Sequence, residues 1–198
     1  MAINYILEGK IEESYKALRL ASEMSRTYYE KPLILTYSGG KDSDVLVQLA
    51  IECLNTSDFE IINSHTTVDA PETVYYIRDR FKEWNDRGIK STVKMPHYKD
   101  GRPMTMWSLI VDKKMPPTRL QRYCCAKLKE TSIKDRMIAT GVRGAESVNR
   151  RGRDVFSYYE PSKSERHYYS TEHAHEVFAE SLEKTEGGCE VIHRGIAC

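Results

Sequence analysis

The sequence has no uninterrupted apolar run of about 18 or more residues, and its start lacks the basic and apolar regions of a signal peptide. These absences argue against a membrane-spanning or secreted protein, so we expect a cytoplasmic protein without a membrane partner. The sequence also lacks an excess of one charge, because it contains 30 Lys and Arg and 29 Asp and Glu, a net charge of +1. No overall positive field therefore indicates a nucleic acid as the partner.

Cysteine is scarce and odd in number, with five residues of which two are adjacent. This count disfavours a secreted disulfide framework and favours metal or redox chemistry. Cys124 and Cys125 cannot easily pair with each other, but both can reach one cluster, with Cys189 and Cys198 as the remaining ligands. Four thiolates suit an iron–sulfur cluster or a structural zinc ion, and unligated thiols are the alternative. Cys53 is interpreted as a small core residue.

Internal repeats, low-complexity tracts and linkers are absent from the sequence, and 198 residues suit one domain. We therefore expect a single domain over residues 1–198, with an irregular, Cys-containing segment from about residue 150. Strand patterns alternate with helical patterns, which predicts an α/β fold with one open, mostly parallel sheet and helices on both faces. The predicted strands are 33–37, 59–64, 90–95 and 137–142. The predicted helices are 11–29, 42–53, 72–87, 104–111, 126–130 and 171–184.

A glycine pair separates the first predicted strand from the helix that follows it. Glycine lets the backbone approach an anion closely, and a helix N-terminus offers unpaired N–H groups and a positive dipole end. The loop therefore predicts a phosphate site, and a solvated glycine turn is the alternative. The residues expected to contact phosphate are Ser38, Gly39, Gly40, Lys41, Asp42 and Ser43.

Four sequence blocks in order resemble a known family. Tyr37–Ser43 (YSGGKDS) resembles the PP-loop of the N-type ATP pyrophosphatases, and Thr67–Thr73 (TVDAPET) resembles their second block. Gly141–Ser147 (GVRGAES), followed by Arg150, resembles the third. Together with Arg122–Lys129 (RYCCAKLK), these blocks resemble the phosphoadenosine-phosphosulfate reductase family.

The resemblance implies an adenine nucleotide alpha hydrolase-like sheet with strand order 3-2-1-4-5, phosphates on the PP-loop and adenine near the second strand. It also implies that the arginine block faces the phosphate or sulfate end, where a guanidinium fork suits an oxyanion. We expect Mg²⁺ to bridge the phosphates, held by Asp42 or Asp69. The expected catalytic residues are Lys41, Arg143 and Arg150. The expected nucleotide-binding residues outside the loop are Asp69, Glu72 and Arg143.

Three functions remain open at this stage. The first is an ATP pyrophosphatase that adenylylates an acceptor for sulfur transfer, because the cysteines after Gly188 resemble the DndC-type proteins of DNA phosphorothioation, which carry a [4Fe–4S] cluster. Its candidate partners are a cysteine desulfurase as sulfur donor, DNA through partner proteins, and a second copy in a homo-oligomer. The second is a sulfonucleotide (PAPS or APS) reductase, although the order of Gly188–His193 differs from the reductases' catalytic motif. The third is a non-catalytic nucleotide-binding module.

Overall fold

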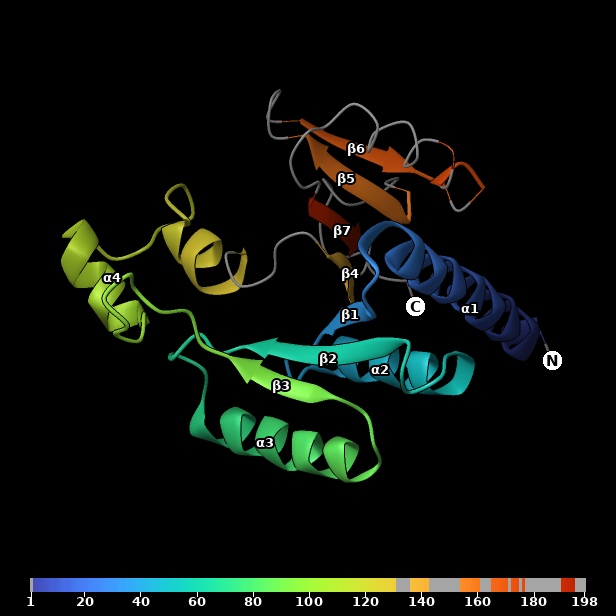
Figure 1. Ribbon diagram of the computed structural model, residues 1–198, viewed down its shortest axis with the longest axis horizontal. Helices are drawn as coiled ribbons and strands as arrows, with labels where there is room; N and C mark the ends of the chain where they lie inside the picture. Colours follow the sequence, from blue (N-terminus) through green and yellow to red (C-terminus); the bar gives the residue numbers. More distant parts are fainter. Residues whose placement is uncertain are drawn as a thin grey trace.

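The computed structural model describes residues 2–130, 136–142, 154–160, 165–170, 172–174, 176 and 190–194 (Figure 1). The helices are α1 Ala2–Tyr29, α2 Lys41–Cys53, α3 Pro71–Asp86, α4 Met106–Lys113 and the π-helix η1 Cys125–Glu130. The strands are β1 Leu33–Thr36, β2 Phe59–Ser64, β3 Ser91–Lys94, β4 Met137–Thr140, β5 Phe156–Glu160, β6 Glu165–Tyr169 and β7 Glu190–Arg194.

The strands form one sheet in the order β3-β2-β1-β4-β7-β5-β6. Neighbours from β3 to β7 are parallel, whereas β5 runs antiparallel to both β7 and β6. The predicted α/β class and the 3-2-1-4 part of the predicted order are therefore confirmed. The place beside β4 is taken by β7, and the tyrosine-rich segment forms the β5–β6 hairpin at the end of the sheet (Figure 1).

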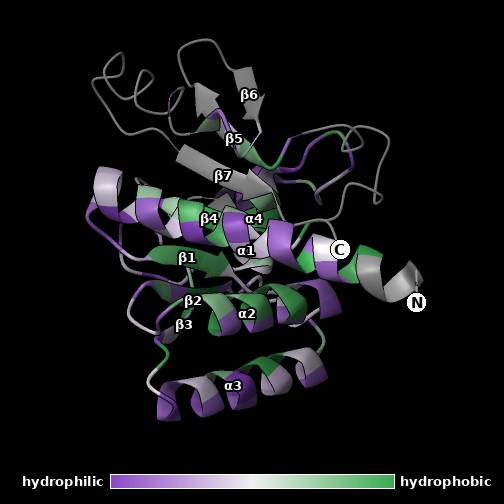
Figure 2. Ribbon diagram, turned by 90° about the vertical axis from the view of Figure 1, so that its right-hand side faces the viewer, coloured by the Kyte–Doolittle hydropathy of each residue, from purple (hydrophilic) through white to green (hydrophobic). Residues whose placement is uncertain are grey.

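Local sequence explains where the elements begin. The first three residues of β1 are apolar and buried, as expected of a parallel strand that is covered on both faces. In contrast, α1 and α3 carry both hydrophobic and hydrophilic residues (Figure 2). Helix α3 begins at Pro71, whose fixed φ suits a first helical position. Helix α4 begins with a capping box in which the side chains of Thr105 and Ser108 bond each other's backbone N–H.

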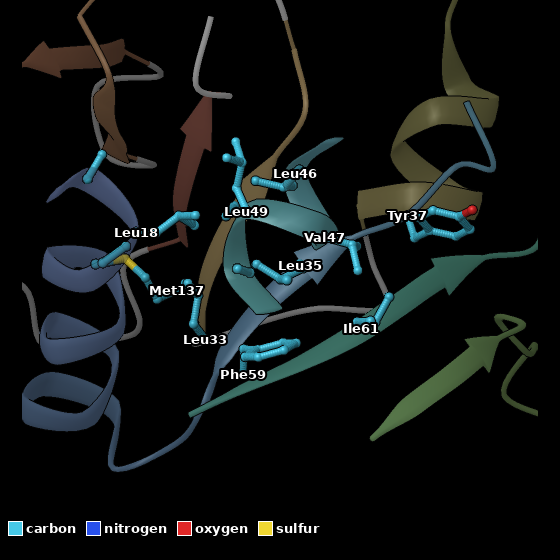
Figure 3. Close-up of a cluster of buried hydrophobic side chains, with 14 of the residues drawn as sticks. Leu18, Leu33, Leu35, Tyr37, Leu46, Val47, Leu49, Phe59, Ile61 and Met137 are labelled. Carbon is cyan, nitrogen blue, oxygen red and sulfur yellow. The ribbon is translucent and has the colours of Figure 1, made fainter. Parts of the chain in front are cut away.

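The two faces of the sheet carry separate apolar clusters. On one face, residues of β1, β2 and β4 pack against α1, α2 and α3. Figure 3 shows labelled side chains of this cluster from α1, α2, β1, β2 and β4. On the other face, Ile34, Ile62 and Ile138 form a second cluster, since successive strand residues point to opposite sides. The labelled residues of the larger cluster are Leu18, Leu33, Leu35, Tyr37, Leu46, Val47, Leu49, Phe59, Ile61 and Met137.

Several predicted elements differ in extent or type. Helix α1 begins at Ala2, well before the predicted start at Ile11. The predicted α-helix at residues 126–130 is a π-helix, which is rare outside single turns. Most of the predicted helix at 171–184 lies outside the described residues. No helix in the described part of the chain is long and apolar enough to cross a membrane.

Candidate functional site

The carboxyl ends of β1 and β4 define the position of the candidate site. The chain leaves β1 toward β2 on one side, whereas β4 lies on the other side of β1 and is reached only after β3. This reversal is a topological switch point, where open α/β sheets bind ligands. The PP-loop, residues 38–43, follows β1 at this point, so the predicted loop lies where the fold favours a ligand site.

The glycine pair gives the PP-loop its shape. Gly39 has a φ of +76°, and a Cβ at this position would lie 3.0 Å from Cγ1 of Ile77 in α3. Gly40 is the N-cap of α2 and supplies no side-chain cap. The first N–H groups of α2 therefore lack the usual side-chain partner, and this geometry suits an anion such as a phosphate.

Two serines hold the loop from inside. The hydroxyl of Ser43, which is buried, donates a hydrogen bond of 2.7 Å to the carbonyl of Gly40. The same Oγ accepts from the backbone N–H of Ser38 at 3.3 Å and lies 3.2 Å from the Ser38 hydroxyl. Ser38 itself is exposed, and its hydroxyl also accepts from the backbone N–H of Gly40 at 3.4 Å.

Gly141 contributes to the site in a way that sequence reasoning missed. It directly follows β4, and a Cβ there would lie 2.6 Å from the carbonyl oxygen of Asp42 and 3.1 Å from the backbone nitrogen of Ser43. Real Cβ atoms do not approach backbone this closely, so only glycine lets α2 begin against the end of β4. The sequence signal that could have found it is that Gly141 is the first residue of the third block, Gly141–Ser147.

Tyr37 connects the loop to the core and was also missed as a site residue. Its buried ring packs edge-on against Trp84, with the ring centroids 5.0 Å apart. Its hydroxyl donates to Oδ1 of Asp44 at 2.6 Å, and its carbonyl accepts from the side chain of Asn63 at 2.8 Å. Burial, and then the hydrogen bond to Asp44, raise the pKa of Tyr37 far above its ordinary value. The hydroxyl therefore stays a donor at neutral pH.

Charged groups predicted to bind the nucleotide lie around the loop. Lys41 is exposed and makes no ion pair among the described residues. Asp42 lies in the first turn of α2, where the helix dipole favours negative charge, and Asp44, which was not predicted as a site residue, lies in the same turn. Glu72 is exposed in the first turn of α3, next to Thr73, whose side chain would lie 3.3 Å from a Cβ on Gly39.

The loop after β2 places Asp69 beside a small pocket between β2, β3 and α3. Asp69 is exposed, and Oδ2 accepts a hydrogen bond of 2.6 Å from the hydroxyl of Thr66. Thr67, between them, has a φ of +66°, a left-handed conformation that is costly for a β-branched residue and often occurs at functional sites. The pocket is lined by Asn63, His65, Asp69, Val74, Ile77, Arg78 and Val93.

The predicted cysteine ligands are described only in part. Cys124 and Cys125 are free, half-buried thiols, and the Arg122 guanidinium donates to Sγ of Cys125 at 3.5 Å. Cys189 and Cys198 lie outside the described residues, as do the predicted catalytic arginines Arg143 and Arg150. Among the residues that are described, no three His, Cys, Asp or Glu side chains form a group that could hold a metal ion.

Cys53 belongs to the core rather than to this set. It is half-buried on α2 and packs against the larger apolar cluster. Burial raises the pKa of its thiol to about 11, so it is a poor thiolate donor at neutral pH. This placement agrees with its interpretation as a small core residue.

Comparisons with known proteins identify the family. Among solved structures, the U34-tRNA thiolase NcsA from Methanococcus maripaludis, solved with its [4Fe-4S] cluster, is 22% identical, with a TM-score of 0.43. The match covers 69% of this chain and 47% of the thiolase, so this chain spans about half the length of that protein. Curated protein sequences give no match. Residues 32–169, more than half of the chain, match the phosphoadenosine phosphosulfate reductase domain, and the protein therefore belongs to that family.

Proposed function

We propose that this protein is an ATP pyrophosphatase that adenylylates an acceptor for sulfur transfer, in DNA phosphorothioation. A non-bridging oxygen of a DNA phosphodiester attacks the α-phosphorus of ATP. A new P–O bond forms, the bond between the α-phosphorus and the bridging oxygen breaks, and pyrophosphate leaves with the electron pair. The attacking oxygen is already anionic, so this step transfers no proton. A sulfur nucleophile at the sulfide level then attacks the phosphorus of the adenylylated DNA, a P–S bond forms, the P–O bond to AMP breaks, and AMP leaves with the electron pair.

The observation that carries this proposal is the uncapped start of α2 against β4. The N-cap Gly40 leaves N–H groups for the phosphates, and the close approach at Gly141 places them at the switch point of the sheet. Lys41 would neutralise charge that develops on the leaving pyrophosphate, and Arg143 and Arg150 would contact the other phosphate oxygens. Belonging to the phosphoadenosine phosphosulfate reductase family supports a sulfur-related reaction on an adenine nucleotide.

The carboxylates near the loop fit Mg²⁺ as the counter-ion. Asp42 lies in the first turn of α2, where a bound triphosphate would bring like charges together. Mg²⁺ prefers carboxylate and phosphate oxygens, so an ion held by Asp42 or Asp69 would offset this repulsion. The hydrogen bond from Thr66 holds the Asp69 carboxylate in place. The adenine would then occupy the region between β2 and β3, near Asn63.

We also propose that Cys124 and Cys125 bind a [4Fe–4S] cluster together with Cys189 and Cys198. The two described thiols are adjacent and half-buried, and Sγ of Cys125 accepts from the Arg122 guanidinium, so both thiols can ligate one cluster. Such a cluster would supply sulfur chemistry beside the adenylylated acceptor. A cytoplasmic cysteine desulfurase would be the sulfur donor, with a thiol reductant that reduces its persulfide to the sulfide level. A homo-oligomer or DNA-bound partner proteins would complete the assembly.

The test of the reaction is the pair of products formed from ATP. With Mg²⁺ and acceptor DNA, the protein should release AMP and pyrophosphate. Lys41→Ala should lose about tenfold or more in ATP affinity or turnover, because a charge-assisted phosphate contact is worth roughly 1.5 to 3 kcal/mol. Lys82→Ala is the matched control, because Lys82 is exposed near the far end of α3.

Other outcomes would assign a different function. ADP and phosphate as the only products, or equal behaviour of the two lysine variants, would contradict the pyrophosphatase. Sulfite release from a sulfonucleotide in the presence of thioredoxin would establish the reductase that the family name favours. Tight ATP binding without turnover on any acceptor would indicate a nucleotide-binding module.

The cluster has an independent test. Protein purified without oxygen should contain iron and absorb visible light, and Cys124→Ser or Cys125→Ser should lose both signals. Cys53→Ser is the control and should keep them, because Cys53 packs against the core. Zinc in place of iron, or full iron content in the Cys124 and Cys125 variants, would refute this assignment.

A further inference from the structure

Positive charge is concentrated in one segment of an almost neutral chain. Residues 96–130 contain eight Lys and Arg but only three Asp and Glu, a net charge of +5, so the rest of the chain carries −4. The segment connects β3 to β4 and includes α4 and η1. All eight basic side chains are exposed. A polyanion that meets this surface would therefore encounter a local positive field that the net charge conceals.

Two of the three acidic groups in the segment have partners other than Lys113, Lys114 and Arg119. Asp100 is paired with Arg102 at 2.7 Å, and Asp112 accepts a hydrogen bond from the Tyr98 hydroxyl at 2.6 Å. Within the described part of the chain, Lys113, Lys114 and Arg119 make no ion pair. These three cations remain available to a ligand.

An exposed tryptophan lies in the same segment as these cations. Trp107 has 68% of its surface exposed on α4, although tryptophan is usually well buried. Val111, one turn later on the same face, is 75% exposed, and Lys114 follows after another turn. Leu109 is buried and anchors the helix, and the capping box at Thr105 fixes its start. The indole is therefore presented to solvent by an anchored helix.

This surface adjoins the edge of the sheet that carries the nucleotide site. The backbone N–H of Met106 donates to Oγ1 of Thr67 at 2.9 Å, so the start of α4 is tied to the loop that holds Asp69. Figure 1 shows β2 and β3 pointing toward the side of the molecule where α4 lies. A ligand on α4 would consequently reach toward the site proposed for ATP.

We infer that the surface formed by Trp107, Lys113, Lys114 and Arg119 binds single-stranded DNA. Trp107 stacks on an unpaired base, and the three cations neutralise neighbouring phosphates. Charge complementarity favours a polyanion over a protein partner, because the centres of protein interfaces are depleted in charged residues and in lysine especially. The inference rests on the proposed function, for which it identifies the surface that holds the acceptor.

Fluorescence anisotropy with a labelled single-stranded DNA of about 20 nucleotides tests this surface. Trp107→Ala should weaken binding about fivefold or more, because stacking on one base contributes that much or more. Tyr75→Ala on α3 is the matched control, since Tyr75 is 63% exposed and lies on another element. Replacing the three cations with alanine should flatten the slope of log affinity against log salt by about two. Lys10→Ala with Lys82→Ala is the charge control.

Three results would overturn the inference: no DNA binding, wild-type binding by both surface variants, or tighter binding of an RNA of the same sequence. Light scattering provides a further check, because a dimer that Trp107→Ala converts to a monomer would assign the surface to a second copy of the chain. Calorimetric Mg·ATP binding tests the nucleotide site separately. Intact ATP binding without DNA binding would refute this surface alone, whereas DNA binding without ATP binding would refute the proposed reaction alone.

Discussion

The amino ends of the parallel strands form one edge of the sheet, the amino edge, and their carboxyl ends form the opposite edge, the carboxyl edge. At the amino edge, Glu60 is buried at the start of β2, and its carboxylate oxygens lie 2.6 Å from a guanidinium nitrogen of Arg136 and 2.8 Å from Nζ of Lys90. At the carboxyl edge, Lys41 is exposed without an ion pair among the described residues, and Gly40 leaves α2 without a side-chain cap. Within the described part of the chain, the first edge pairs its charges within the protein, although Arg136 Nε is a buried donor without a partner, and the second leaves Lys41 unpaired and the start of α2 without a side-chain cap. The amino edge therefore stabilises the sheet, and the carboxyl edge remains available for a ligand.

Substitutions at the two edges should therefore change different quantities: the free energy of unfolding at the amino edge and the ATP affinity at the carboxyl edge. Arg136 also donates to the carbonyl of Pro32 at 2.6 Å, so one guanidinium connects the entries to β1, β2 and β4. A substitution there should lower the free energy of unfolding and leave the ATP affinity of the folded protein unchanged. A substitution near the PP-loop should mainly change ATP affinity.

The largest expected effect is that of Glu60→Gln on stability. Removing one partner of a buried ion pair leaves the other charge uncompensated, which costs about 3 to 5 kcal/mol. Denaturant unfolding at neutral pH measures this loss. Glu83→Gln is the control and should cost less than about 1 kcal/mol, because Glu83 pairs with Arg80 on the surface. Equal losses in the two variants would contradict the assigned role of the amino edge.

The pH dependence of this pair has a definite sign. Burial alone would raise the pKa of Glu60, but hydrogen bonds and charge from Lys90 and Arg136 dominate and hold it below its ordinary value of about 4.5. The stabilisation is thus fully present above about pH 4.5 and is lost as pH falls through the lowered pKa. The difference in unfolding free energy between wild type and Glu60→Gln should therefore narrow in acid.

Gly141→Ala should have the next largest effect, at the carboxyl edge. The added Cβ meets backbone of Asp42, which cannot move aside as a side chain could, so β4 and α2 must separate at a cost of about 1 to 3 kcal/mol. We expect weaker ATP binding, measured by calorimetry. Gly9→Ala is the control, because a Cβ on Gly9 has no neighbour within 4 Å. Unchanged ATP affinity in Gly141→Ala would separate this contact from the nucleotide site.

The sequence alone predicted those strands, helices and turns that depend on residues close together in the chain. The alternation of apolar strands with amphipathic helices predicted β1 to β4 within about two residues at each end, and the glycine pair predicted the turn before α2. The 3-2-1-4 order came from the family resemblance, but no strand was predicted at residues 190–194, so the pairing of β7 with β4 was missed. The π-helical turn at Cys125 was missed because good helix formers do not distinguish the two kinds of helix.

Contacts between distant residues explain what was missed at the candidate site. The pairing of Glu60 with Arg136 and the approach of Gly141 to Asp42 depend on strand order, which no local pattern contains. The near-neutral composition concealed the basic segment, since the charge of residues 96–130 is offset elsewhere in the chain. The roles of Arg143 and Arg150 stay predictions, because both residues lie outside the described part of the structure.

Tyr37→Phe should have the smallest effect, and it tests how the carboxyl edge is held. The variant keeps the ring contacts with Trp84 and removes only the hydrogen bond to Asp44, which should cost about 1 kcal/mol. Asp44 retains the more exposed Tyr76 hydroxyl at 3.3 Å, so Tyr76→Phe is the control with a smaller loss. ATP affinity should fall only a few-fold, because the N–H groups of α2 remain in place.

The same hydrogen bond predicts a pH dependence. Because the pKa of Tyr37 is raised above its ordinary value of about 10, the stabilisation from the Tyr37 hydroxyl is constant below that pH and is lost as pH rises further. Unfolding measured at pH 7 and in alkali should show the gap between wild type and Tyr37→Phe narrowing only in alkali, and a gap that widens there would contradict the hydrogen bond as drawn.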